Sequence, residues 1–573
     1  MDFFARGESM ADTIAIGIQD FEKIRSKHCF YIDKTSFIKE WWDASDEVTL
    51  IARPRRFGKT LNMSMLECFF SVDYAERGDL FEGLSIWEDE KYRSLQGTYP
   101  VISFSFANVK EGDYETTSYR IRQLLMKQFE KYSFLLKSEV LSKTEKAYFE
   151  KLASDMSQLD APMALYQLSD YLYRYYGKKV IILLDEYDTP MQEAYLSGYW
   201  EKLVGFTRSF FNSTFKTNPY LDRAVMTGIT RVSKESVFSD LNNLKVVTST
   251  SNEYATVFGF TEEEVFHALE MYECGDKKEN VKKWYDGFIF GEQNDIYNPW
   301  SIINFLRTKG QFDTYWANTS SNGLVGKLIR EGSKRVKTSF ESLLKDETIF
   351  CPIDEQIVYN RLDLSERSIW SLLLASGYLK VISRESEDMV TGSSHLKYEL
   401  ALTNYEVKCM FEYMIHEWFE ETEGDYNDFV EALLLGDIDA MNDYMNLVAQ
   451  QMFSSFDTGK KPSQLQPERF YHGFVLGLMV ELAGKYVITS NRESGFGRYD
   501  VVIEPKSKEE DAIILEFKVF NPRKENSLED TVEFALAQIE EKKYESDLLA
   551  KGFVKNQIRK YGFAFEGKTV LIG

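Results

Sequence analysis

The sequence predicts a multidomain α/β protein that begins with a parallel, three-layered α/β domain. Its 573 residues are too many for one hydrophobic core, and this length suggests three or four domains. The N-terminal part alternates apolar, strand-like runs with long helical patterns. Such alternation is typical of a parallel sheet covered by helices on both faces.

Four apolar segments are expected to form strands of this sheet, at 48–52, 99–106, 179–188 and 222–233. The third is continuously apolar and ends in acidic residues, as expected for a strand that is buried on both faces. A helix is expected at 59–70, and a helix-rich stretch at 113–176.

The rest of the chain is expected to be mostly helical up to a C-terminal sheet. From 258 to 346 the pattern is helical, with an N-terminal capping box at Thr261 and Glu264. A helix-rich stretch with a hairpin near 377–400 follows, and then a linker with two prolines at 458–468. Residues 485–520 alternate like a β-meander, and a helix is expected at 528–549.

The composition limits the partners and the compartment. With 68 Lys and Arg against 91 Asp and Glu, the net charge is −23, so any nucleic acid must bind through a local patch. The five cysteines are scattered without a C-x-x-C pair, which argues against a disulfide framework or a zinc ribbon. The sequence has neither an export signal nor a run of eighteen apolar residues, so we expect a cytoplasmic protein without a membrane span.

A candidate phosphate loop, "RPRRFGKT", links the first expected strand to the helix at 59–70. Such a loop offers backbone N–H groups at a helix N-terminus, a lysine for phosphate oxygens and a hydroxyl for Mg²⁺. Position 53, where such loops usually begin with glycine, is arginine. Proline in the loop stiffens the turn, and the arginines add positive charge. The expected nucleotide-binding residues are Arg53, Pro54, Arg55, Arg56, Phe57, Gly58, Lys59, Thr60 and Leu61.

The acidic partner of this loop is expected where the strand at 179–188 ends. Asp185 would join Thr60 in binding Mg²⁺, and Glu186 would polarise the attacking water. Thr227, Thr230 and Arg231 end the next strand, where they can face the γ-phosphate of ATP or simply satisfy a turn. A phosphate loop followed in the chain by a buried strand that ends in Asp185 and Glu186 favours a site for ATP and Mg²⁺.

A second candidate site lies in the C-terminal meander. Glu516 and Lys518 are two residues apart, so they project from one face of a strand. A hairpin centred on Lys508 would set Asp500 opposite Glu516, within reach of one Mg²⁺ or Mn²⁺. Two carboxylates and a lysine around a metal suit phosphodiester cleavage, although exposed strands also carry such charges.

The chain resembles a known prokaryotic family through several motifs in order: "FEKIRSKHCFYIDKTSFI", "IARPRRFGKTLNMSML", "LLDEYDTP", "TGITRVSKESVFSDLNNL", "FGFTEEEV", "WYDGF" and "YNPWS". It is similar to the AAA-ATPase-like proteins, which commonly carry a C-terminal nuclease domain of the PD-(D/E)XK class. That family tolerates the arginine-rich loop, so the absent glycine looks like a family feature. The resemblance implies a P-loop NTPase domain at 10–250, a helical lid at 251–370, a connecting region at 371–465 and a nuclease-like domain at 466–573.

The resemblance also implies further nuclease residues. Gln538 would be catalytic, and Lys542 is similar to other helix residues of this nuclease class. Glu468 or His472, on an expected leading helix at 468–479, can add to the site, although a histidine on an apolar helix is more often packed. The motifs "WYDGF" and "YNPWS" are expected to be core and turns of the lid.

Two functions from different classes fit these features. The first is an ATPase coupled to cleavage of nucleic acid, with DNA favoured over RNA and a link to mobile elements or defence. The second is a nucleotide-switched interaction protein whose C-terminal domain binds without cutting. An arginine supplied in trans would imply a homo-oligomer, but Arg231 can equally act within its own subunit.

Overall fold

The structure is a computed structural model in which two compact units are distinguished. It describes residues 12–230, 237–238, 241–316, 325–326, 328–329, 334–354, 366–386, 396–420, 426–452, 475, 485–490, 493–494, 497–498, 500–507, 510–566 and 569–573. The first unit holds residues 1–328 and 346–410, and the second holds 329–345 and 411–573. The finer domain boundaries given above remain predictions.

A five-stranded parallel sheet forms the centre of the first unit. Its strands are arranged in the order β2-β3-β4-β1-β5. Four strands confirm the predicted segments, β1 with the predicted bounds and the other three with shifted ends, and β5 is an additional strand. The bounds are β1 (Val48–Ala52), β2 (Val101–Ser105), β3 (Val180–Asp185), β4 (Leu221–Gly228) and β5 (Leu244–Val247).

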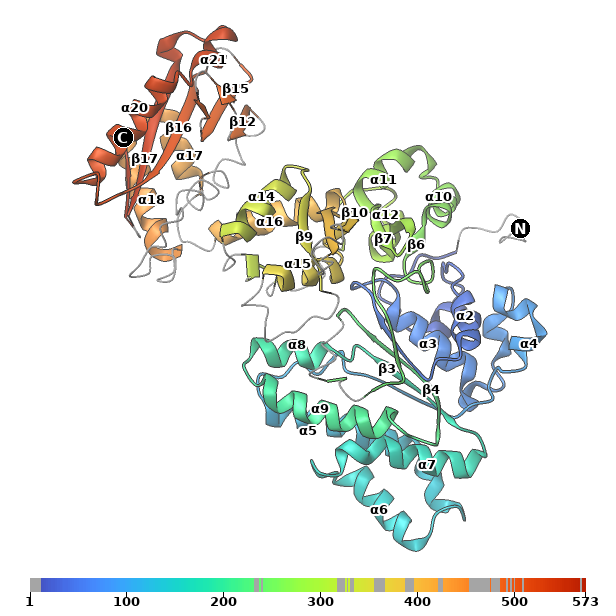
Figure 1. Cartoon of the computed structure of the whole chain (residues 1–573). Helices are drawn as coiled ribbons and strands as arrows, with labels where there is room; N and C mark the ends of the chain where they lie inside the picture. Colours follow the sequence, from blue (N-terminus) through green and yellow to red (C-terminus); the bar gives the residue numbers. More distant parts are fainter. Residues whose placement is uncertain are drawn as a thin grey trace. The chain divides into compact units, whose positions relative to one another are not determined.

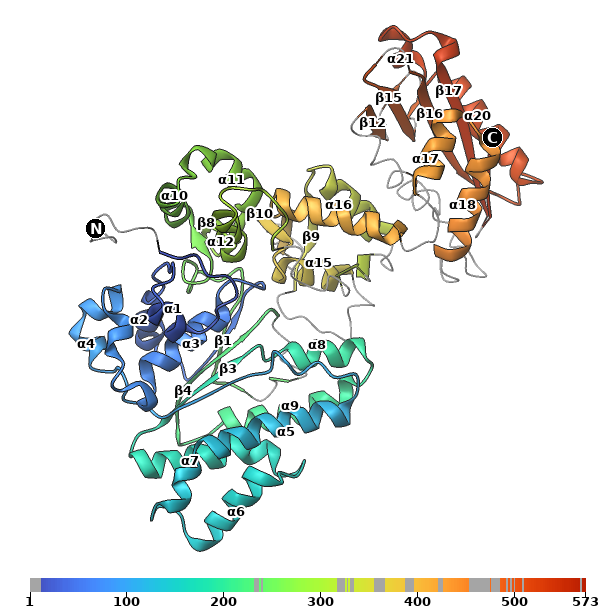
Figure 2. The ribbon, with the colours of Figure 1, turned by 180° about the vertical axis from the view of Figure 1, so that it is seen from behind.

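Helices cover both faces of this sheet, as predicted for a three-layered domain. In Figures 1 and 2, α2 and α3 lie on one side, and α5, α7 and α9 lie on the other. Helix α3 contacts β2 and β3, and α7 contacts β3 from the opposite face. The helices are α1 (Phe21–Ser26), α2 (Ser36–Ala44), α3 (Lys59–Phe70), α4 (Glu90–Arg93), α5 (Tyr114–Lys131), α6 (Lys143–Ser154), α7 (Ala164–Tyr176), α8 (Thr189–Leu196) and α9 (Trp200–Phe215).

The lid region, the name used below for residues 251–316, is less helical than its pattern predicts. It contains three helices, but an antiparallel sheet of order β6-β8-β7 joins them. The short strands were missed because β6 and β7 are too brief to show an alternating pattern. The elements are β6 (Phe260–Thr261), α10 (Glu262–Met271), α11 (Lys278–Tyr285), β7 (Phe288–Phe290), β8 (Gln293–Tyr297) and α12 (Pro299–Arg307). The capping box of Thr261 and Glu264 is confirmed.

A second antiparallel sheet in the first unit confirms the hairpin predicted near 377–400. Strands β10 and β11 form the hairpin, and β9 pairs with β11. The bounds are β9 (Ile349–Pro352), α15 (Glu366–Ala375), β10 (Leu379–Ser386) and β11 (Leu396–Leu402).

A cluster of carboxylates in the lid surrounds one lysine. Lys282 donates to Glu262 and to Asp295 (3.1 Å), and its Nζ lies 3.8 Å from Asp286 Oδ2. Asp286 is only 9% exposed, and its Oδ1 accepts no hydrogen bond. Burial raises the pKa of Asp286 to about 7, whereas the bond from Lys282 lowers the pKa of Asp295. Asp286 is therefore the carboxyl of this pair that takes up a proton first as the pH falls, and Lys380 faces the pair from β10.

This cluster predicts a pH dependence of stability. Because the pKa of Asp286 is higher in the folded chain than in the unfolded chain, the folded state binds more protons between about pH 4 and 7. Its contribution to stability is therefore lost as pH rises through about 7. We expect Asp286→Asn to narrow the difference in Tm between pH 5.5 and 8 by about 2 °C, as measured by scanning calorimetry. Equal pH profiles for wild type and variant would contradict this assignment.

The second unit contains a five-stranded sheet of order β12-β15-β16-β17-β18. Strands β16 and β17 are parallel, and the other pairs are antiparallel. The predicted linker lies outside the described residues, and so does the helix expected at 468–479 except for Val475. The bounds are α14 (Lys334–Leu344), α16 (Tyr405–Glu420, beginning in the first unit), α17 (Tyr426–Leu435), α18 (Ile438–Met452), β12 (Tyr486–Ser490), β15 (Val501–Pro505), β16 (Ala512–Val519), α20 (Leu528–Lys542), α21 (Ser546–Ala550), β17 (Ile558–Glu566) and β18 (Thr569–Ile572).

Different helices pack on the two faces of this sheet. Ile503 and Leu515 belong to the core shared with α17 and α18, whereas Val502 and Ile514 pack with Ile539 of α20. Because side chains alternate along a strand, even-numbered residues of β15 and β16 face α20. Among the described residues, no helix is long and apolar enough to cross a membrane.

Candidate functional site

The predicted phosphate loop lies between β1 and α3. Gly58 has φ of 77°, a left-handed conformation that suits glycine, and α3 begins at the next residue. The Nζ of Lys59 donates to the carbonyl oxygens of Arg53 (2.9 Å) and Pro54 (2.8 Å). Lys59 is buried, and burial lowers its pKa against the opposing effect of Glu186 and Asp185. The loop thus surrounds a buried lysine at a helix N-terminus.

The side chain of Arg53 corrects one prediction. It was expected to bind nucleotide, but it is fully buried and turned out of the loop. Its guanidinium donates to the carbonyls of Thr248 (2.5 Å) and Glu253 (3.2 Å) and lies 4.4 Å from the ring centroid of Phe290. Arg53 is not among the residues with positive φ, so its backbone does not require glycine. Its guanidinium stabilises the loop base and is not available to a phosphate.

Asp185 is positioned between two threonine hydroxyls. Thr60 Oγ1 donates to Asp185 Oδ2 at 2.8 Å, and Thr227 Oγ1 donates to Asp185 Oδ1. These contacts join the start of α3 to the ends of β3 and β4. Burial raises the pKa of Asp185, and the two hydroxyl bonds oppose that shift. The hydroxyl of Thr227, which was expected to face the nucleotide, is instead buried on Asp185.

Two further acids follow Asp185. Glu186 has a left-handed φ of 51°, its N–H donates to Thr227 Oγ1 (3.3 Å), and its Oε2 accepts from Thr189 (3.2 Å). Asp188 is buried, and its Oδ2 accepts from Ile229 N, Thr230 N and Thr230 Oγ1, each at 2.9 Å. Thr230 therefore fixes a turn, and Arg231 lies outside the described residues. Asp188 was not among the predicted site residues, although its place in the acidic motif "DEYD" could have indicated it.

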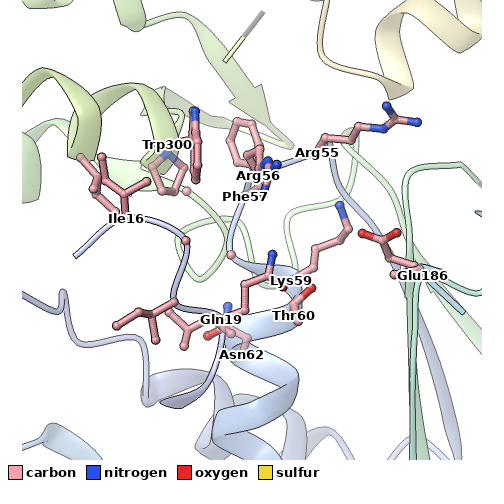
Figure 3. A pocket seen from close by; sticks show the side chains of 18 of the residues that line it. Ile16, Gln19, Arg55, Arg56, Phe57, Lys59, Thr60, Asn62, Glu186 and Trp300 are labelled. Carbon is pink, nitrogen blue, oxygen red and sulfur yellow. The ribbon is translucent and has the colours of Figure 1, made fainter. Parts of the chain in front are cut away.

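A pocket of about 450 Å³ opens over this arrangement. Figure 3 shows Lys59, Thr60 and Glu186 close together, and Arg56 beside Trp300. Neither Arg53 nor Pro54 lines the pocket. Its lining combines the loop from Arg55 to Asn62 with residues 15–19, 29–32 and 107–108, and with Lys34, Lys110, Glu186, Thr189, Gln192, Val257, Gly259, Phe260, Trp300 and Ile303. This volume suits a small ligand with a polar, phosphate-sized end and an apolar end.

The C-terminal site has the predicted register. Strand β15 pairs with β16 through Val501 and Leu515, so the next pair outward is Asp500 with Glu516. Asp500 Oδ2 accepts the N–H of Phe517 at 2.8 Å. Asp500, which directly precedes β15, is therefore next to Glu516 of β16, on the face toward α20.

Side chains from β16 and α20 converge on Glu516, which is 1% exposed. Glu516 Oε1 accepts from Lys518 Nζ (3.0 Å) and from Gln538 Nε2. Gln538 also donates to the hydroxyl of Tyr544 (3.0 Å), a buried residue that the sequence analysis missed. Lys542 pairs instead with its neighbour Glu541 (3.8 Å), whereas Glu468 and His472 lie outside the described residues.

Both regions match known families. Residues 15–238 match the family described as "Predicted AAA-ATPase", and residues 466–573 match the "PD-(D/E)XK nuclease superfamily". The chain joins an AAA-ATPase-like domain to a PD-(D/E)XK nuclease-superfamily domain. The parallel sheet with its loop is accordingly a P-loop NTPase domain.

The proteins similar to this chain include one known from its sequence and one of solved structure. An uncharacterised protein encoded 5′ of vnfD in Azotobacter chroococcum is 25% identical over 404 residues, or 69% of this chain and 68% of that protein. The second is the Aeropyrum pernix ORC2 protein, solved as ADPNP and ADP complexes. Its match spans 66% of this chain and 92% of the ORC2 chain, with 9% sequence identity and a TM-score of 0.23. Similarity this low decides nothing about function.

The lid region contributes more to the pocket than the sequence indicated. "WYDGF" and "YNPWS" were interpreted as core and turns, yet Trp300 lines the pocket and Phe288 packs on Phe57 with ring centroids 4.7 Å apart. Asn298 does cap α12, as a turn residue would. No local pattern marks such contacts, because Phe288 and Trp300 lie more than 200 residues beyond the loop in the sequence.

Proposed function

We propose that the chain binds and hydrolyses ATP in the pocket of the AAA-ATPase-like domain, and that its C-terminal domain is a metal-dependent nuclease. The observation that carries the proposal is the contact between Thr60 and Asp185 beside the buried Lys59. A lysine and a hydroxyl at the start of α3 meet a carboxylate at the end of β3, which is the arrangement that a triphosphate with Mg²⁺ requires.

The residues of the first site fit ATP and Mg²⁺ by their chemistry. Thr60 and Asp185 offer the hard oxygen ligands that Mg²⁺ prefers. Lys59 is held within the loop and would bind the β- and γ-phosphates, while Arg55 and Arg56 line the same pocket. When bound, Mg²⁺ neutralises charge on the phosphate oxygens.

Glu186 is proposed to act as the base for hydrolysis. It lines the pocket, and its backbone N–H and its carboxylate are each held by a threonine. A water oriented by Glu186 would bond to the γ-phosphorus as the bond to the β–γ bridging oxygen breaks, and the water's proton would pass to the carboxylate.

Glu186→Gln tests that role. Glutamine keeps an oxygen for the Thr189 hydroxyl but is not basic, so we expect kcat for ATP hydrolysis to fall about 100-fold or more with ATP affinity retained. Steady-state phosphate release and equilibrium binding of ATP measure the two effects. Glu201→Gln, at an exposed position in the first turn of α9, is the matched control. Unchanged turnover in Glu186→Gln would remove Glu186 from the mechanism.

The C-terminal site is proposed to cut phosphodiester bonds. Asp500 and Glu516 would hold Mg²⁺ or Mn²⁺, which helps activate a water, and Lys518 and Gln538 would orient the water and the phosphate. Hydrogen bonds from Lys518 and Gln538 to one oxygen of Glu516 support this grouping.

Incubation with labelled single- and double-stranded DNA and RNA, with and without ATP and Mn²⁺, tests the proposal. We expect metal-dependent cutting, of DNA in preference to RNA, whose rate changes when ATP is added. Such gating requires ATP to bind two conformations with different affinity. ATP-dependent binding without cutting would favour the nucleotide-switched interaction protein, which the net charge of −23 supports. A role in mobile elements or defence, a cytoplasmic location and a homo-oligomer remain predictions.

A further inference from the structure

The phosphate loop is held from outside by the lid region. Phe57 is fully buried, and its ring centroid lies 4.7 Å from that of Phe288 and 5.5 Å from that of Phe290. On the other side of the loop, the carbonyl oxygen of Arg55 accepts from Trp316 Nε1 at 3.0 Å and from Asn298 Nδ2 at 3.4 Å. The loop backbone is therefore bonded to the lid at a residue that also lines the pocket.

These contacts fix the direction of one peptide group. In a trans peptide the C=O and the following N–H point in opposite directions. Because the Arg55 carbonyl points to the donors of the lid, the N–H of Arg56 points away from them. The two preceding carbonyls, of Arg53 and Pro54, are instead directed at Lys59. The orientation thus changes within the loop, at the peptide between Arg55 and Arg56.

The same peptide leads into an unfavourable backbone conformation. Arg56 has φ of 65°, where a residue with a Cβ is strained and glycine is not. Its guanidinium lies 4.5 Å from the ring centroid of Trp300, in the first turn of α12. A glycine-rich loop adopts such conformations without strain, because glycine has no Cβ. This loop instead carries proline, two arginines and phenylalanine before Gly58. Contacts from the lid are available to hold the conformation.

Trp316 is itself held on two sides. Its backbone N–H donates to Glu406 Oε1 at 2.6 Å, and Glu406 Oε2 accepts from Ser301 at 2.8 Å. Its ring packs against Phe288 (5.5 Å) and Tyr378 (5.4 Å). The indole N–H that reaches Arg55 is therefore fixed by surrounding contacts.

We propose that Trp316 and Asn298 are positioning residues of the nucleotide site, which orient the peptide between Arg55 and Arg56 for the phosphates and hold Arg56 in a left-handed conformation that glycine would adopt without strain. The inference rests on the proposed binding of ATP. The two lid residues would thus strengthen phosphate binding without contacting a phosphate. An Arg56 N–H that already has the required direction lowers the free-energy cost of ordering the loop when the ligand binds.

Two conservative substitutions in the full chain test this proposal. Trp316→Phe keeps an aromatic ring against Phe288 and Tyr378 but removes the indole donor. Asn298→Asp keeps an oxygen to cap α12, where Asn298 Oδ1 accepts from Trp300 N and Ser301 N, but removes the amide donor. For each variant we expect the Kd of ADP and of a non-hydrolysable ATP analogue to rise about threefold to tenfold.

AMP separates positioning from general damage, because it lacks the β- and γ-phosphates that the loop would contact. We expect its Kd and the Tm of the nucleotide-free protein to change little in both variants. Trp284→Phe is the matched control, since Trp284 packs on Phe312 and Tyr405 and does not line the pocket.

Each contrary outcome has a distinct meaning. If wild type binds ADP and both variants bind it equally well, only the positioning role fails. If affinity for AMP falls as much as affinity for ADP, or Tm falls with them, the residues are structural and the inference is overturned. If wild type binds no nucleotide, the proposed function fails and the inference fails with it.

Discussion

Replacing Lys59 with methionine is expected to weaken ATP binding about 100-fold or more. Methionine keeps most of the buried stem but removes the ammonium, and each charge-assisted bond to a phosphate contributes about 1.5–3 kcal/mol. The same change should leave the Tm of the nucleotide-free protein unchanged or higher. Burial lowers the pKa of Lys59, so without a phosphate its charge is costly in this position.

Equilibrium binding of ATP and thermal unfolding without nucleotide measure the two effects. Lys178→Met is the matched control. Lys178 is partly buried, 3.8 Å from the ring centroid of Tyr99, but it lies just before β3, at the end of that strand opposite to Asp185. A Lys59→Met protein that binds ATP like wild type would exclude the loop as the phosphate site.

Asp500→Asn is expected to lower metal-dependent cleavage about 1,000-fold. Removing one of two carboxylates from a metal site costs several kcal/mol of transition-state stabilisation. Asparagine keeps an oxygen for the Phe517 N–H, so the pairing of the two strands should survive. Cleavage of labelled DNA at saturating Mn²⁺ measures the loss, and ATP turnover should be unaffected.

Glu504→Gln provides the control on the same strand, because Glu504 pairs with Lys551 (2.5 Å) and not with the site. Full cleavage by Asp500→Asn, or an equal loss in both variants, would argue against a metal site at Asp500 and Glu516.

The sequence predicted those features that depend on local pattern. Strand β1 and helix α3 have the bounds that apolar runs and the Gly58 start indicate. The pairing of Asp500 with Glu516 followed from counting residues on either side of Lys508, since an antiparallel hairpin has one simple register.

Features that depend on distant contacts could not be predicted in this way. Arg53 was expected to face a phosphate because of its place in the loop. That place does not determine the direction of its side chain, which is set by Thr248 and Glu253, about two hundred residues further along the chain. Thr227 was expected to face the ligand, but the buried Asp185 takes its hydroxyl. Tyr544 and Trp316 carry no motif, since each matters only through the residue it contacts.

The crossover between β16 and β17 has a consequence for biosynthesis. Glu516 and Lys518 lie on β16, Gln538 lies on the crossover helix α20, and β17 follows that helix in the chain. Until the ribosome has made β17, the strand that carries Glu516 is an edge of an unfinished sheet without its parallel neighbour. In the nascent polypeptide, the side chains around Glu516 therefore gain their complete sheet only after the ATPase-like region has been translated.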